Sequence, residues 1–115
     1  MKKLSTLLLL FTLSAILFAQ KKDALTLFHE ANMAYQKQDY AKSISLYEEL
    51  TKNGNISAEV YFNLGNSYFK EGNVPKAIIN YERAKKLAPD DEDITFNLKI
   101  ASLKVVDRID NVPEV

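Results

Sequence analysis

The feature that most constrains this chain is an internal match at a spacing of 34 residues. The residues that recur are Ala24, Phe28, Asn32, Lys42, Ile44, Tyr47, Glu48 and Lys52, which return as Ala58, Phe62, Asn66, Lys76, Ile78, Tyr81, Glu82 and Lys86. The triplet Phe62-Asn63-Leu64 returns once more as Phe96-Asn97-Leu98. A period of this length is one helix–turn–helix unit of a stacked repeat protein. Because each unit contacts only its neighbours, the sequence predicts a solenoid with a concave binding face.

The spacing of apolar residues predicts five helices, over residues 22–37, 40–52, 57–71, 74–87 and 91–109. Asp39 and Asn73 are placed to cap the helices that follow them. Gly54 is placed to end the second helix in a left-handed conformation. On the first helix, the residues at helical spacing that define the expected packed face are Leu25, Phe28, Ala31, Asn32 and Tyr35.

The second unit resembles the tetratricopeptide repeat, whose signature is W-x2-L-G-x2-Y, then A-x3-F, then P. The residues that carry this resemblance are Tyr61, Leu64, Gly65, Tyr68, Ala77, Tyr81 and Pro89. The resemblance implies an all-α solenoid with repeats at about 24–57 and 58–91 and a capping helix at about 91–109, so that the repeat domain spans 20–110. Small Gly65 indicates a close helix crossing. Lys99, at the equivalent position of the last helix, indicates a solvated end.

The ends of the chain differ from the repeats. Residues 1–19 have a basic start, an apolar run from Leu4 to Phe18, and Ala19 before Gln20, as in a signal peptide that is cleaved after Ala19. An uncleaved anchor is the alternative, although the run is shorter than the roughly 20 residues of a spanning helix. We therefore expect an exported protein, in the periplasm or on the outer face of the inner membrane. Residues 111–115 form a tail without periodicity.

A narrower resemblance covers residues 20–115, which are similar to the N-terminal part of the BatE proteins of Bacteroidetes. The segments that carry it are 61–66, 80–84, 87–94, 107–109 and 112–113, the last reading Val112-Pro113. That family belongs to a set of membrane and periplasmic proteins linked to aerotolerance, and its later part carries transmembrane helices. The resemblance implies either a truncated copy of a membrane-anchored protein or a shared module.

The concave face should be lined by the first helix of each unit. The residues expected to form a partner-binding groove are Phe28, Asn32, Tyr35, Gln36, Phe62, Asn63, Asn66, Phe69 and Lys70, and Phe96, Ile100 and Leu103 continue the row. An asparagine amide both donates and accepts, which suits a groove that holds a peptide backbone. In the alternative interpretation, the phenylalanines are partly core and Asn32 and Asn66 only cap or solvate.

Other chemistries have little support in the sequence. Cysteine is absent and His29 is the only histidine, so we expect no metal site and no disulfide. The acidic run 90–93 lacks the glycine and terminal glutamate spacing of a calcium loop. We expect no enzyme activity, no cofactor and no small-molecule substrate. The net charge is zero, without the clustered basic face that binds nucleic acid.

A known carboxylate clamp of such repeats is also not expected. Phe28 stands at one of its lysine positions, and Asp93 and Asn97 stand at its basic positions on the last helix. The first functional hypothesis is therefore an exported adaptor that binds a peptide or a neighbouring envelope protein. The second is a fixed structural subunit of an envelope complex. Any contact with the membrane would come through a partner or a missing C-terminal region.

Overall fold

The computed structural model describes residues 22–110 and residue 113 and shows an all-α chain. Its helices are α2 (Ala24–Gln36), α3 (Tyr40–Lys52), α4 (Ala58–Glu71), α5 (Val74–Leu87) and α6 (Glu92–Asp110). The expected helices agree with these bounds within two residues at each end. No strand occurs among the described residues. The expected signal peptide at 1–19 lies outside the described residues, as does the expected tail at 111–115 apart from Pro113.

The helix ends follow from capping side chains. The side-chain oxygens of Asp39 and Asn73 accept hydrogen bonds from backbone N–H groups three residues on, at 3.2 and 3.3 Å. Ser57 accepts one from the N–H of Val60 at 3.1 Å. Gly54 and Gly72 end α3 and α4 with φ of 85° and 89°, a conformation that costs glycine little because it has no Cβ.

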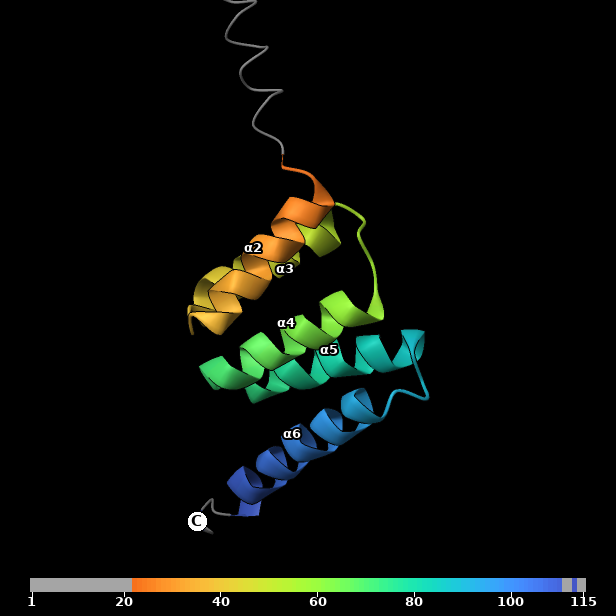
Figure 1. The fold of residues 1–115 in the computed structure, drawn as a ribbon. Helices are drawn as coiled ribbons and strands as arrows, with labels where there is room; N and C mark the ends of the chain where they lie inside the picture. Colours follow the sequence, from red (N-terminus) through yellow and green to blue (C-terminus); the bar gives the residue numbers. More distant parts are fainter. Residues whose placement is uncertain (1–21, 111–112, 114–115) are drawn as a thin grey trace, which may run out of the picture.

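The helices stack as hairpins in chain order (Figure 1). Helices α2 and α3 form the first antiparallel pair, α4 and α5 form the second, and α6 lies at the end. Each helix packs mainly against its neighbours in the sequence, and α2 makes a smaller contact with α4. This is the arrangement of a helical repeat solenoid, in which every interface except the hairpin contacts joins one unit to the next.

The buried side chains recur with the repeat. The most completely enclosed large side chains include Tyr47 on α3 and Tyr81 on α5, at equivalent positions. The expected packed face of α2 was partly wrong. Leu25 is 78% exposed, whereas Leu27 is buried beside Ala31 and Ala34. Leu25 stands in the first turn of α2, where the stack has no preceding helix among the described residues to cover it.

Gly65 marks the closest helix approach. A Cβ built on Gly65 would lie 2.7 Å from two ring carbons of Tyr81. The ring is almost fully buried and its hydroxyl is hydrogen-bonded, so it cannot easily move away. The expected crossing at Gly65 is therefore confirmed, and the group that requires glycine is the Tyr81 ring.

Helix α6 ends the stack with one polar face. The residues equivalent to Tyr61, Gly65 and Tyr68 are Thr95, Lys99 and Ser102, and all three are exposed. In the second unit, the matching face packs against α5. The exposed Lys99 agrees with the solvated end that the sequence indicates. Within the described part of the chain, no helix has the length and apolar character needed to cross a bilayer.

Candidate functional site

Two adjoining cavities follow the first helices of the units. The one between α2 and α4 has a volume of about 210 Å³ and is lined by Asn32, Tyr35, Gln36, Tyr47, Asn63 and Asn66. The other, between α4 and α6, has a volume of about 230 Å³ and is lined by Tyr35, Asn66, Phe69, Lys70, Tyr81, Asn97 and Ile100. Tyr35 and Asn66 belong to both linings. The two cavities therefore adjoin at these residues, and we call them together the inner groove.

The inner groove is built on a hydrogen-bonded unit that occurs twice. In the first, the Oδ1 atom of Asn32 accepts from the Tyr47 hydroxyl and, at 3.5 Å, from the Nδ2 atom of Asn63. In the second, the Oδ1 atom of Asn66 accepts from the Tyr81 hydroxyl at 2.6 Å and from Asn97 Nδ2 at 2.9 Å. Each unit joins the two helices of one repeat to the first helix of the next.

These bonds decide what Asn32 and Asn66 can offer a ligand. Their carbonyl oxygens are engaged inside the protein. Their Nδ2 groups make no hydrogen bond with other described residues, although both side chains line the groove. An amide nitrogen has two donor hydrogens. The inner groove therefore presents two hydrogen-bond donors, one per repeat, in equivalent positions.

The tyrosines of the two units are held in their neutral form. Burial raises the pKa of the Tyr47 hydroxyl to about 12, and a hydrogen bond with the Asn63 side chain opposes this in part. Burial likewise raises the pKa of Tyr81 above its ordinary value. A neutral phenol keeps its proton and can donate it to an asparagine oxygen. The orientation of both asparagines is therefore fixed at physiological pH.

The expected groove residues separate into two groups. Asn32, Tyr35, Gln36, Asn63, Asn66, Phe69 and Lys70 line the inner groove. Phe28 and Phe62 line neither cavity. Their rings pack on the tyrosines, with Phe28 edge-on to Tyr47 at 6.2 Å between centroids and Phe62 tilted against Tyr81 at 5.9 Å. These two phenylalanines therefore pack against the buried tyrosines of the two units, and Phe28 also lines a separate cavity between α2 and the start of α4.

Three groove residues escaped the sequence analysis: Tyr47, Tyr81 and Asn97. The rings of the two tyrosines are buried, and both residues also line the groove. Asn97 could have been found from the repeat, since it stands 34 residues after Asn63. The described residues contain no group of acidic, histidine or cysteine side chains that could hold a metal ion.

Comparison with known proteins identifies part of the chain. Residues 58–91 match the tetratricopeptide repeat family, and this segment contains α4 and α5. A comparison with curated protein sequences gave no match. Repeats of this family generally mediate protein–protein interactions. The chain therefore carries a tetratricopeptide repeat at residues 58–91, within an all-α helical repeat solenoid that includes a candidate groove for another protein.

Proposed function

We propose that the protein binds an extended segment of another protein in the inner groove. The observation that carries this proposal is the repeated unit of asparagine, tyrosine and asparagine, which leaves the Nδ2 groups of Asn32 and Asn66 directed to a ligand. Peptide carbonyl oxygens are the natural acceptors for such donors. Two donors in equivalent positions, one per repeat, suit a ligand that presents a carbonyl at regular intervals.

The size and lining of the groove favour a peptide over a small molecule. Ligand pockets for drug-sized molecules enclose about 300–1,000 Å³. Each cavity of the inner groove is smaller than this and opens to solvent, so it suits one or two side chains of a longer ligand. Tyr35 and Phe69 add aromatic surface beside the amides, and aromatic residues are enriched among groups that dominate protein interfaces.

The structure dictates how the groove should be tested. Changing Asn32 to alanine would remove the acceptor of the buried Tyr47 hydroxyl and destabilise the fold. Asn32→Asp together with Asn66→Asp keeps both acceptors, replaces each exposed Nδ2 donor with a carboxylate oxygen and adds one negative charge at each position. A library of random twelve-residue peptides displayed on phage supplies the ligand. We expect peptides selected on the wild-type protein to bind the double variant at least about tenfold more weakly.

A control with the same change in charge is available outside the groove. Ser45→Asp with Asn53→Asp alters two exposed positions on α3 and at its end. This variant should bind the selected peptides as the wild type does, and circular dichroism should show equal helix content in all three proteins. A library that yields no binding peptide, or peptides that bind the groove variant unchanged, would contradict the proposal and favour a fixed structural subunit.

For the cellular setting, we propose an exported adaptor of an envelope complex. The support is the signal-peptide pattern of residues 1–19 and the resemblance to the BatE proteins. In that setting the partner is another envelope protein, and a link to aerotolerance comes only through the resemblance. Mass spectrometry of the N-terminus from the native host tests export. A mature protein that begins at Gln20 is expected, and a species that retains Met1 contradicts cleavage.

A further inference from the structure

The inner groove changes in character from α2 to α6. Three positions of the repeat show this change when the equivalent residues of α2, α4 and α6 are compared. The first reads Asn32, Asn66 and Ile100, the second reads Tyr35, Phe69 and Leu103, and the third reads Gln36, Lys70 and Lys104. The α2 end is polar and uncharged, whereas the α6 end is apolar and positively charged. A ligand that crosses the groove therefore meets two different surfaces.

We propose that the α4–α6 end of the inner groove selects a peptide segment in which apolar residues alternate with acidic ones. This inference rests on the proposed function and specifies the chemistry of the ligand. Apolar side chains would lie on Phe69, Ile100 and Leu103. Carboxylates would lie beside the ammonium groups of Lys70 and Lys104.

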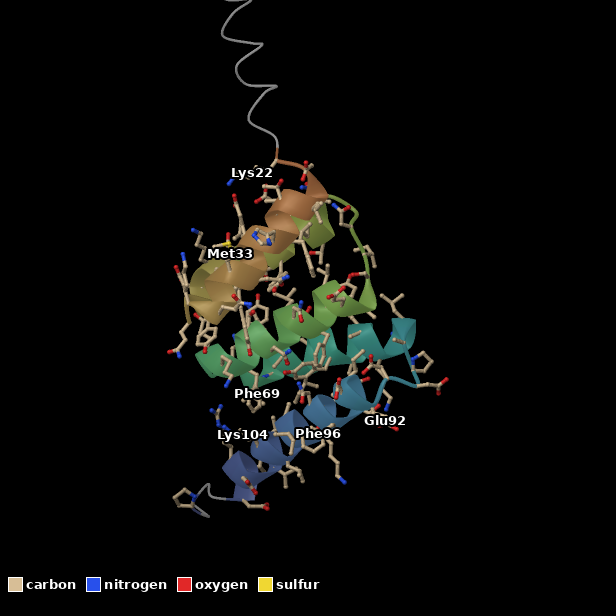
Figure 2. All side chains as sticks on the ribbon, in the orientation of Figure 1. Lys22, Met33, Phe69, Glu92, Phe96 and Lys104 are labelled. Atoms are coloured by element: carbon tan, nitrogen blue, oxygen red, sulfur yellow. The ribbon has the colours of Figure 1, made fainter. Side chains whose placement is uncertain are left out.

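The positive charge at the α4–α6 end comes from Lys70 and Lys104. Lys70 lines the cavity between α4 and α6. The Nζ atom of Lys104 lies 5.0 Å from the centroid of the Phe69 ring, and Figure 2 shows the two side chains facing each other from α6 and α4. This cation–π contact places the Lys104 ammonium group beside Phe69, which lines the cavity. No acidic residue belongs to either groove lining among the described residues.

The acidic residue next to Lys70 in the sequence, Glu71, lines a separate cavity together with Arg108. Glu59 and Asp93 stand eleven residues before Lys70 and Lys104. At a rise of 1.5 Å per residue, this places them about 16 Å away along their helices. Asp107 lies one turn after Lys104 on α6 and makes an interaction of its own within the protein.

The apolar part of the site is exposed and contiguous with the cations. Leu103 is 52% exposed and Ile100 is 38% exposed, and Phe96 on the same face of α6 is 63% exposed. These residues recur at the 3–4 spacing that places them on one stripe of the helix. Contiguous exposed apolar side chains mark an interaction surface. Bordered by Lys70 and Lys104, this stripe is complementary to a segment that is both apolar and acidic.

The test uses three fluorescein-labelled peptides of one design and the full-length protein. Each peptide begins with a Ser-Gly half. In the second half, Leu alternates with Glu in the first peptide, with Gln in the second and with Lys in the third. At low ionic strength we expect the Glu peptide to bind about tenfold more tightly than the Gln peptide, a difference of about 1.4 kcal/mol. The Lys peptide should bind most weakly. Raising the salt concentration should reduce the preference, because exposed charges are screened.

Variants assign the preference to the two lysines. Lys70→Ala with Lys104→Ala should bring the Glu and Gln peptides to equal affinity, and Lys70→Glu with Lys104→Glu should favour the Lys peptide. The matched control is Lys52→Ala with Lys86→Ala, which removes two exposed lysines, again 34 residues apart, from α3 and α5. This control should keep the tenfold preference of the wild type.

The outcomes separate this inference from the proposed function. If the Glu and Gln peptides bind equally and Asn32→Asp with Asn66→Asp weakens both, the groove binds peptides without charge selection and this inference is wrong. If none of the three peptides binds while the phage library yields ligands, the inference is also wrong and the proposed function stays. Sedimentation that shows dimers dissociated by Leu103→Glu would make this stripe an interface between two copies and overturn the inference.

Discussion

At the level of single residues, two tyrosine side chains contribute both to the core and to the inner groove. The rings of Tyr47 and Tyr81 fill the core, and their hydroxyls fix the asparagines of the inner groove. Asn80 on α5, by contrast, has a buried side chain in which one of the two polar atoms has no hydrogen-bond partner among the described residues. Its Nδ2 donates to the carbonyl of Lys76 at 2.9 Å, but its Oδ1 is buried without a partner among the described residues. Leu46 stands at the equivalent position of the first repeat.

Gly65→Ala tests the tight packing on Tyr81. Alanine gains up to about 1 kcal/mol in helix propensity, but its Cβ would meet the ring carbons of Tyr81 at 2.7 Å. Overpacking of this kind costs about 1–3 kcal/mol, so we expect a net loss of stability. Urea unfolding followed by circular dichroism measures it. An unchanged or higher midpoint would show that the Tyr81 ring moves aside without cost.

At the scale of helices, the interface between the two repeats contains a polar contact that the following interface lacks. The Oγ atoms of Ser43 on α3 and Ser67 on α4 are hydrogen-bonded at 2.9 Å, and both residues are fully buried. The equivalent positions on α5 and α6 are Ala77 and Ala101, also fully buried. The same packing is therefore achieved once with a hydrogen bond and once without it.

A double-mutant cycle measures this contact between α3 and α4. Each single change, Ser43→Ala or Ser67→Ala, should cost up to about 1 kcal/mol, because the bond between the two hydroxyls is lost while the remaining hydroxyl keeps its bond to a backbone carbonyl. The double variant should cost less than the sum, since it recreates the alanine pair of the next interface. Chemical denaturation of the four proteins gives the coupling. Ser45→Ala with Ser67→Ala is the control and should be additive, because Ser45 is exposed.

At the scale of the whole molecule, three tyrosines join neighbouring helices through their hydroxyls. Tyr47 and Tyr81 reach the asparagines of the groove, and Tyr68 on α4 donates to the carboxylate of Glu48 on α3. Burial raises the pKa of each hydroxyl, and the carboxylate of Glu48 raises that of Tyr68 further. The integrity of the stack therefore depends on phenols that stay protonated.

Alkaline pH should accordingly unfold the protein. In the unfolded chain a tyrosine ionises near its ordinary pKa of 10.0, whereas in the folded chain Tyr47 ionises at about 12. The unfolded state thus loses protons first, and the stability contributed by these groups is complete below pH 10 and lost as the pH rises toward 12. Tyrosinate absorbance should rise in two steps, the second together with loss of helix. A single step near pH 10 with helix retained would contradict this.

Much of the architecture could be predicted from local patterns in the sequence. The spacing of apolar residues predicted the five helices of the described residues, and Asp39, Asn73 and Gly54 predicted helix ends that the structure confirms. Capping and helix formation depend on groups only a few residues apart, so the sequence contains the needed information. The prediction of the packed face of α2 was partly wrong, because periodicity alone does not show which helices are present to cover Leu25.

The groove residues were likewise only partly predictable from the sequence. The repeat frame indicated Asn32 and Asn66 as equivalent inward positions, and both line the inner groove. It did not indicate that their oxygens are engaged by Tyr47 and Tyr81, or that Asn63 and Asn97 complete the units. Those bonds join atoms on three helices. They exist only when the hairpins are stacked at one separation, which is a property of the packed molecule.

The repeat, the helices and the small residue at the Gly65 crossing could be predicted before the structure was known, because they follow from residue spacing and local chemistry. Only the packed helices show that the Oδ1 atom of each asparagine is engaged inside the protein while its Nδ2 group is left without such a bond. The tertiary structure alone also decided that Phe28 and Phe62 pack against the buried tyrosines instead of lining the inner groove, and that Lys104 lies against Phe69. The physical reason is that burial and hydrogen-bond geometry depend on side chains about 15 to 35 positions apart, and the stacked helices bring those side chains into contact.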